Sequence, residues 1–171
     1  MPGRGSAPVP EPWGRFLRAL DSLLTEAIDL HCLGGFVVTM QYGLSRTTAD
    51  IDILTAIPPG RLSELQRYAG EGSDLHRRFG VYLQPVRIVT YPENYETRLI
   101  RMWPDHAFEH LGLFALEAHD LALTKLERNS DVDRQDVQEL ARVGLSTKQP
   151  CASVTRGSTG RISRPERRST I

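Results

Sequence analysis

Two carboxylates, Asp50 and Asp52, are separated by a single residue in a run that alternates polar and apolar side chains. This alternation predicts a strand, and side chains two residues apart on a strand point to the same side of the sheet. The two carboxylates therefore share one face, while Ile51 and Ile53 face the core. Paired carboxylates can hold one or two Mg²⁺ ions, which assist phosphoryl transfer.

A pair of glycines, Gly34 and Gly35, lies upstream at a predicted strand-to-helix turn. Because glycine has no Cβ, backbone amides at this turn can come close to a triphosphate. Arg46, Thr47 and Thr48 come just before the aspartates and are candidate phosphate contacts. A Gly-Gly pair alone usually marks only a turn, and Asp-x-Asp is often the solvent side of a strand. The combination at this gap is more specific, and it favours a nucleotide-phosphate site.

The elements that must position these residues follow from hydrophobic periodicity and from Gly and Pro breakers. Strands are predicted over 30–33, 50–55 and 81–89, the last as an edge or bulged strand because of its proline, and 111–116 is a strand or a loop. Helices are predicted over 13–30, 36–42, 62–70, 92–103 and 120–128, and a last one opens with a capping box at Ser130 and Asp133 and stops at Gly144. This is an α/β or α+β plan with a small sheet.

Length and composition fit one globular domain, with 171 residues and 40% hydrophobic residues. Residues 1–12 are rich in proline and predict a disordered arm, residues 13–148 form the domain, and residues 149–171 predict a disordered basic tail. No apolar run is long enough for a membrane helix, the start lacks the apolar stretch of a secretory signal, and there are two cysteines. We therefore expect a cytoplasmic protein without a membrane partner.

The net charge of zero hides an asymmetry. Residues 151–171 contain five arginines and one glutamate, a net charge of +4, so residues 1–150 carry −4. An acidic body argues against a large nucleic-acid footprint, and it suits a site that gathers carboxylates for a metal.

The stretch Leu33-Gly34-Gly35, followed by Tyr42-Gly43-Leu44-x-Arg46-x-Thr48-x-Asp50-Ile51-Asp52, resembles the nucleotidyltransferase superfamily, which has the DNA polymerase β-like fold. Within it, the chain is similar to small nucleotidyltransferase-like proteins related to the abortive-infection toxins of type IV toxin–antitoxin systems. The resemblance covers about residues 13–145. The run over 120–128 and the later Asp133-Arg134-Gln135-Asp136 support it loosely, since those toxins carry an Arg-Asp-x-x-Asp run.

The resemblance implies a minimal nucleotidyltransferase fold, a small mixed sheet with helices packed on it, and an NTP–Mg²⁺ site at the sheet edge. It implies Asp50 and Asp52 as metal ligands, Lys125 as a triphosphate contact, and a helical Asp133 or Asp136 that completes the site. The implied reaction moves a nucleoside monophosphate from an NTP to a hydroxyl of an RNA, a protein or a small molecule. A role as a toxin, with an antitoxin as partner, is compatible with this resemblance.

Many members of the superfamily have a third carboxylate on a later strand, whereas the candidate strand over 81–89 has Arg87 as its only charge. Either Asp136 or Glu93 takes that role, or the chain binds nucleotide without fast transfer. Two alternatives to an enzyme therefore stay open: a non-catalytic nucleotide-binding or regulatory module, and an interaction domain in which Asp-x-Asp is only the polar side of a strand.

Histidine and cysteine give weaker signals. His106 and His110 have the i, i+4 spacing of a helical zinc site, but no glutamate directly follows the first histidine, as it does in zinc proteases. His31 and Cys32 fall on a predicted core strand, so packing is their expected role.

Overall fold

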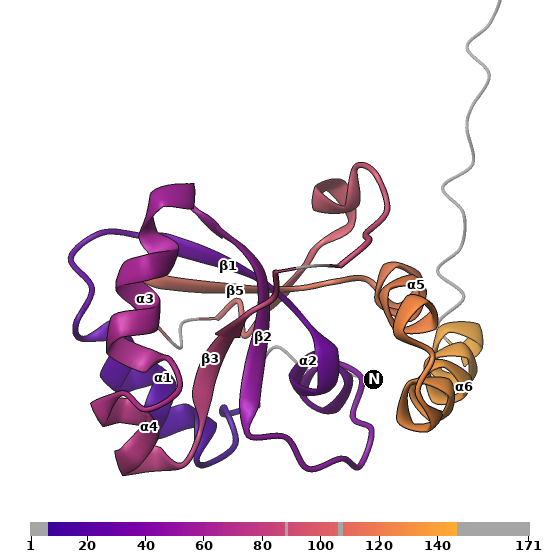
Figure 1. Cartoon of the computed structure of the whole chain (residues 1–171), viewed down its shortest axis with the longest axis horizontal. Coiled ribbons are helices and arrows are strands. Elements are labelled where there is room, and N and C mark those ends of the chain that lie inside the picture. The colour runs from indigo at the N-terminus through magenta and orange to yellow at the C-terminus, as the bar shows by residue number, and fades with distance from the viewer. Residues whose placement is uncertain (1–6, 88, 106–107, 147–171) are drawn as a thin grey trace, which may run out of the picture.

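The computed structural model describes residues 7–87, 89–105 and 108–146. Their strands form one five-stranded sheet in the order β3-β2-β1-β5-β4 (Figure 1). The strands are β1 (Ile28–Leu33), β2 (Asp50–Ile57), β3 (Tyr82–Pro85), β4 (Ile100–Met102) and β5 (Leu111–Ala115). β1 is antiparallel to β2 and parallel to β5, β2 is parallel to β3, and β4 is antiparallel to β5. The mixed sheet confirms the predicted fold class.

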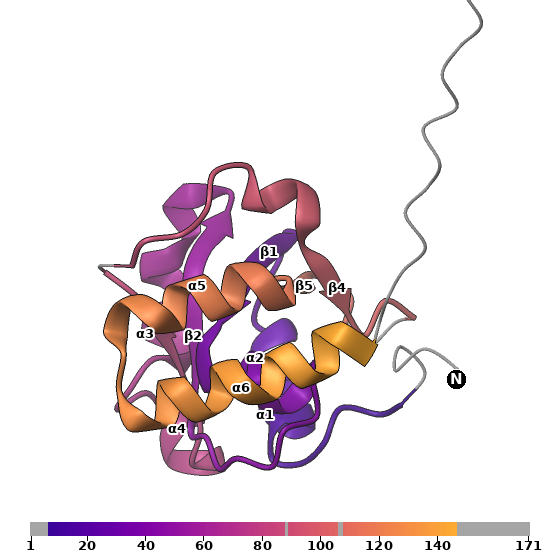
Figure 2. The same cartoon turned by 90° about the vertical axis from the view of Figure 1, so that its right-hand side faces the viewer.

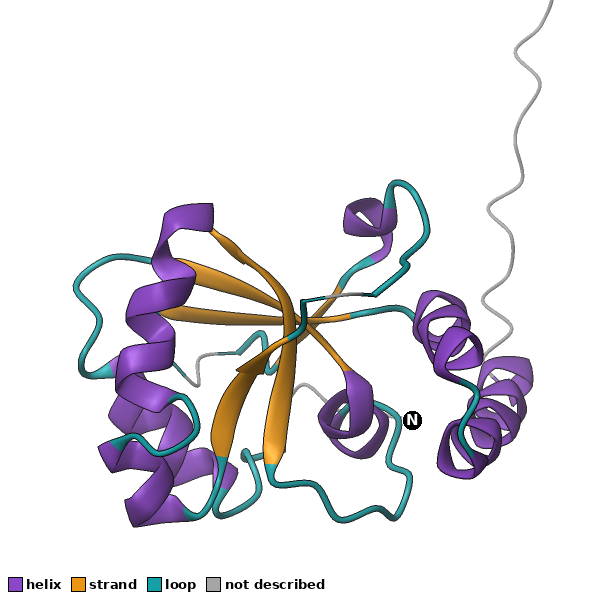
Figure 3. Ribbon diagram, in the orientation of Figure 1, coloured by secondary structure: helices purple, strands orange, loops and turns teal. Residues whose placement is uncertain are grey.

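Helices cover this sheet from two sides. They are α1 (Trp13–Asp21), α2 (Gly34–Met40), α3 (Leu62–Ala69), α4 (Asp74–Phe79), α5 (Ala118–Arg128) and α6 (Asp131–Ser146), with short 3₁₀ turns η2 (Pro59–Arg61) and η3 (Tyr95–Arg98). α1, α3 and α4 gather on one side of the sheet, and α5 and α6 lie side by side at the opposite end of the molecule (Figures 2 and 3). We call α5, α6 and their short connection the α5–α6 hairpin.

The core lies between the sheet and the helices that pack on it. Phe16 and Leu17 of α1 and Phe36 of α2 are fully buried there, because their helices each carry one apolar face. On β2, Ile51 and Ile53 are fully buried while Asp50 and Asp52 are half-buried. The predicted alternation of this strand is therefore confirmed, and it sets both carboxylates on the face away from the core.

One predicted helix was too long and another was wrong. The helix over 13–30 ends at Asp21, whose carboxylate accepts the backbone N–H groups of residues 109–111, and Ile28 then starts β1 beside β5. The helix over 92–103 is replaced by η3 and β4, where Ile100 pairs with Ala115 of β5. In both places, pairing with a distant strand outweighs local helical periodicity.

Smaller differences concern the ends of elements. β3 ends at Pro85 rather than residue 89, and it lies at the edge of the sheet, as its proline predicted. Gly144 does not end α6, which continues to Ser146, and α4 was not predicted. The start of α6 was predicted correctly: Ser130 Oγ accepts the N–H of Asp133 at 3.1 Å, and Ser130 N–H donates back to the Asp133 carboxylate at 3.3 Å. This is the capping box that the sequence indicated.

Residues 7–12 belong to the segment predicted as an arm, and there Val9 is buried in the core while Glu11 pairs with Arg15 and Arg18. This part of the segment packs on the domain. Residues 1–6 and the predicted tail lie outside the described residues. None of the helices described here combines the length and the apolar character needed to cross a membrane.

Candidate active site

The turn from β1 into α2 lies directly against the Asp52 side chain. Gly34 has a φ of +75°, and a Cβ at this position would lie 1.9 Å from Asp52 Oδ2. Only glycine therefore allows the start of α2 to approach the carboxylate this closely. A Cβ on Gly35 would meet Arg46 and Thr48 at 3.5 Å, an ordinary contact. The structure thus brings together the glycine pair, Arg46, Thr48 and Asp52.

Asp50 and Asp52 occupy the same face of β2, as the alternation requires. Thr48 Oγ1 lies 3.1 Å from the backbone oxygen and 3.3 Å from Oδ1 of Asp50, which fixes the strand entry. Burial, and after it the negative charge of Asp50, raises the pKa of Asp52 to about 6. Positive charges from Arg128 and Lys125 oppose this rise. Asp52 is therefore a desolvated carboxylate that gains from a nearby cation.

The α5–α6 hairpin supplies the cations. Lys125 is 3% exposed, and its Nζ donates to Asp136 at 2.7 Å and lies 3.6 Å from Asp133. Arg128 makes two bonds of 2.8 Å to Asp133, and Arg46 pairs with Asp136 from the loop after α2. The bidentate Arg128 contact holds the pKa of the Asp133 carboxyl well below its usual range.

Helical spacing explains why these groups meet. Lys125 and Arg128 are three residues apart and so share one face of α5, while Asp133 and Asp136 share a face of α6. α5 ends at Arg128, Asn129 follows as its C-cap with a φ of +48°, and Ser130 caps α6 directly after it. The short connection places these two faces against each other, so Lys125 and Arg128 of α5 pair with Asp136 and Asp133 of α6.

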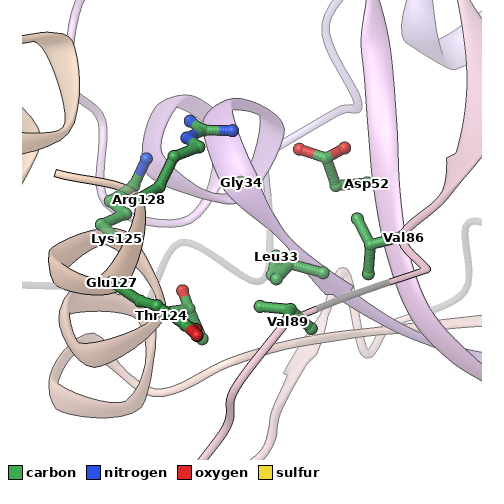
Figure 4. Close-up of a pocket in the computed structure, with 9 residues that line it drawn as sticks. All are labelled: Leu33, Gly34, Asp52, Val86, Val89, Thr124, Lys125, Glu127 and Arg128. Carbon is green, nitrogen blue, oxygen red and sulfur yellow. The ribbon is translucent and has the colours of Figure 1, made fainter. Parts of the chain in front are cut away.

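A pocket of about 290 Å³ lies between the sheet and α5, lined by Leu33, Gly34, Asp52, Val86, Val89, Thr124, Lys125, Glu127 and Arg128. In Figure 4, the Asp52 carboxylate and the Arg128 guanidinium point toward each other across the start of α2 at Gly34. The pocket therefore sets a carboxylate opposite two cationic side chains.

The side chains of the site can be compared with the ligands that a metal ion requires. Within residues 7–87, 89–105 and 108–146, no cluster of three or more His, Cys, Asp and Glu side chains is arranged to hold a metal. Asp50 and Asp52 offer two hard oxygen donors on one face, and Mg²⁺ in proteins is usually held by one or two carboxylates with substrate phosphates and water as the other ligands. The residues present therefore fit Mg²⁺ that arrives with a nucleotide, rather than a metal held by protein alone.

The two candidates for a third carboxylate lie in different settings. Asp136 is tied to Lys125 and Arg46, so it neutralises cations in this structure. Glu93 follows the loop after β3 and contributes its backbone oxygen to Arg98. A role for either one in deprotonating a hydroxyl stays a prediction.

Sequence reasoning missed Arg128, Glu127 and Thr124 as pocket residues. The i, i+3 spacing of Arg128 from the candidate Lys125 is a signal that could have found it.

His31 and Cys32 pack in the protein interior, as predicted. His31 Nδ1 lies 2.9 Å from the Tyr95 hydroxyl, and Cys32 is a fully buried free thiol. His106, half of the zinc hypothesis, lies outside the described residues.

Comparison with known proteins gives one finding. A family model described as "Nucleotidyltransferase of unknown function (DUF6036)" matches residues 17–145, most of the chain. Searches of curated proteins and of solved structures gave no match.

Proposed function

The chain belongs to this family of nucleotidyltransferases of unknown function, and from that premise we propose that it is a cytoplasmic, Mg²⁺-dependent enzyme that transfers a nucleoside monophosphate from an NTP to a hydroxyl. The acceptor is an RNA, a protein or a small molecule. One observation carries the proposal: the Asp52 carboxylate, beside Asp50, lies against the Gly34 backbone and faces Lys125 and Arg128 across one pocket.

In the proposed reaction, the acceptor oxygen forms a bond to the α-phosphorus of the NTP. The bond from that phosphorus to the bridging oxygen breaks, pyrophosphate leaves, and the hydroxyl proton passes to solvent. Lys125 and Arg128 lie where they can offset the charge on the β- and γ-phosphates. Gly34 leaves room for phosphate oxygens that a Cβ would block.

Asp50 and Asp52 are the residues that would hold Mg²⁺. The ion, when bound, supplies charge neutralisation on the triphosphate and favours the ionised form of the attacking hydroxyl. A pKa of about 6 leaves Asp52 ionised at neutral pH, so the carboxylate is already in its ligating form.

A second candidate, nucleotide binding without transfer, is favoured by two observations. No third acid joins Asp50 and Asp52 in a metal-holding group among the residues that the structure describes. In addition, Arg46, Lys125 and Arg128 are already paired with Asp133 or Asp136, so less positive charge is left for a triphosphate. Such a module binds Mg²⁺–NTP and releases no pyrophosphate.

The test incubates the protein with each α-labelled NTP, Mg²⁺, and total tRNA or cell lysate. We expect label on one acceptor class, and loss of that label in an Asp50→Asn/Asp52→Asn double variant. The matched control is Asp74→Asn/Asp131→Asn, which removes two carboxylates that are 94% and 87% exposed. Binding of an NTP without label transfer would favour the second candidate. A chain that neither binds nor transfers would be an interaction domain.

The resemblance to abortive-infection toxins adds a cellular readout. If the chain acts as such a toxin, its expression should arrest growth of a host cell, and the Asp50→Asn/Asp52→Asn variant should not. Growth arrest by both proteins would show that the effect does not depend on the proposed metal ligands.

A further inference from the structure

The pocket has two chemically different ends. Figure 4 shows the charged groups of Asp52, Lys125 and Arg128 at one end, with Val86 beside Asp52, and the other end is lined by Leu33, Val89, Thr124 and Glu127. In Figure 4, Leu33 and Val89 lie across the gap from Thr124 on α5. Apolar walls with a few placed polar groups are what a flat heterocycle requires of a binding site. If the charged end takes the triphosphate, the other end is left for the base.

The polar groups at this second end accept hydrogen bonds. Thr124 is buried, and its hydroxyl donates to the Leu121 carbonyl at 2.7 Å. The hydroxyl proton is therefore used in that bond, and the oxygen can only accept a bond from a ligand. Glu127 is a carboxylate, and an ionised carboxylate has no proton to donate. This end of the pocket therefore offers acceptors and no free side-chain donor among its described lining residues.

Glu127 is an exposed residue of the pocket wall, and Thr90 holds its carboxylate in place. The Thr90 backbone N–H donates to Oε2 at 2.9 Å, and the Thr90 hydroxyl donates to Oε1 at 2.8 Å. These bonds lower the pKa of Glu127, so it stays ionised. Each carboxylate oxygen has a second lone pair, and both oxygens can therefore accept a further bond from a ligand. Thr90 thus positions the acceptor, just after Val89 of the apolar wall.

We propose that Glu127 determines base specificity, selecting nucleotides whose base carries an amino group over those with uracil. Adenine, cytosine and guanine each present an exocyclic amine, which donates to a carboxylate. Uracil presents a single N–H between two carbonyl oxygens, and these oxygens repel the Glu127 charge. The inference rests on the proposed function for the identity of the ligand, because it takes an NTP as the occupant of the pocket.

The test measures Mg²⁺-dependent binding of ATP, GTP, CTP and UTP by calorimetry. We expect the wild-type protein to bind UTP about tenfold more weakly than its best amino-bearing NTP. Glu127→Gln should close that gap, because its amide can donate to a uracil oxygen. The matched control is Glu139→Gln on α6, which is exposed and pairs with Arg142, and it should keep the wild-type preference.

The outcomes separate this inference from the proposed function. If no NTP binds, the proposed function fails. If all four NTPs bind the wild-type protein equally, or if Glu127→Gln keeps the full preference against UTP, the specificity role is overturned while nucleotide binding stands. Should Glu127→Gln fail to fold, Thr90→Val serves instead, because it removes one of the two bonds that hold Glu127. An unchanged preference in that variant would equally overturn the role.

Discussion

The sheet and the α5–α6 hairpin bury different kinds of side chain. In the sheet, the buried positions of β1, β2 and β5 are apolar apart from His31, as Leu30, Ile51 and Leu113 illustrate. The hairpin contains all the other buried polar or charged residues of the described chain: Asp120, Thr124, Lys125, Asp133 and Asp136. Ala118, Leu121 and Leu140 of the hairpin also join the core, so apolar packing stabilises both regions, while buried ion pairs are a feature of the hairpin.

The hairpin is also attached to the rest of the molecule by polar contacts. Asp120 accepts two bonds from Arg98, Glu127 holds Thr90, and Asp136 pairs with Arg46. Buried ion pairs contribute little net stability compared with apolar packing, yet the loss of one partner is costly. This contrast teaches that the sheet can lose an apolar side chain far from the pocket, such as Leu113, without changing ligand binding, whereas each buried charge of the network around Lys125 and Arg128 affects both stability and the pocket.

The largest expected effect comes from Asp133→Asn. Asp133 is fully buried, so the change to Asn removes the charge that pairs with Arg128 at 2.8 Å and leaves Lys125 with Asp136 alone. We expect the free energy of unfolding to fall by about 3–5 kcal/mol in chemical denaturation. Mg²⁺–NTP binding, measured well below the melting temperature, should weaken as well, because both cations line the pocket.

The control for Asp133→Asn is Asp131→Asn, two residues earlier on α6. Asp131 pairs with Arg134 and its side chain is 87% exposed, so its loss should cost less than about 0.5 kcal/mol. Equal costs for the two variants would show that the hairpin charges do not form the network described here.

A sheet variant, Leu113→Ala, should behave differently. Leu113 lies on β5 and is 1% exposed, so the change leaves a cavity and costs about 3 kcal/mol of unfolding free energy. The matched control is Leu126→Ala on α5. Leu126 is 50% exposed, so this change should lower the free energy of unfolding by less than about 0.5 kcal/mol. The folded Leu113→Ala protein should bind Mg²⁺–NTP with unchanged Kd. A large rise in Kd would contradict the separation of the two regions.

The sequence predicted the features that depend on neighbouring residues alone. The faces of β2 and the glycine turn were predicted because alternation and a missing Cβ are local properties of Gly34, Asp50 and Asp52. The capping box at Ser130 is equally local. These features need no knowledge of what packs against them, and so the sequence alone indicated them.

The parts that were not predicted depend on distant pairing. The segment over 92–103 has helical periodicity, yet Ile100–Met102 forms β4 because β5 offers it a ladder. Glu127 reaches the pocket because Thr90 meets it from the loop after β3. Lys125 and Asp136 were candidates only through a family resemblance, since their ion pair crosses two helices. The catalytic roles of these residues stay predictions.

The next largest effect concerns Asp52 and has the opposite sign. Its folded pKa of about 6 lies above the ordinary value of 3.8, so between pH 4 and 6 the folded state binds a proton that the unfolded state does not. Stability therefore falls as the pH rises through 6. Asp52→Asn should be more stable than the wild-type protein by about 3 kcal/mol at pH 8, and this gain should vanish by about pH 4.

The measurement is chemical denaturation of the metal-free protein at several pH values. Asp74→Asn is the control, because its side chain is 94% exposed and its loss should change the free energy of unfolding by less than about 0.5 kcal/mol. A destabilised Asp52→Asn protein at pH 8 would indicate a structural acid and would remove the main support for a metal ligand.

The smallest expected effect sharpens the comparison within the hairpin itself. Ser130 caps α6 through the Asp133 N–H, and its hydroxyl also bonds the Asp133 carboxylate. Ser73 caps α4 through the His76 N–H at 3.1 Å, and its hydroxyl bonds to none of the buried carboxylates of the described residues. Each Ser→Ala change should cost about 1 kcal/mol for the lost cap. Ser130→Ala should cost measurably more, because Asp133 also loses a hydrogen bond that helps to keep it ionised beside Arg128. Paired denaturation curves decide this, and a smaller cost for Ser130→Ala than for Ser73→Ala would mean that the hydroxyl contributes nothing to the buried charge network.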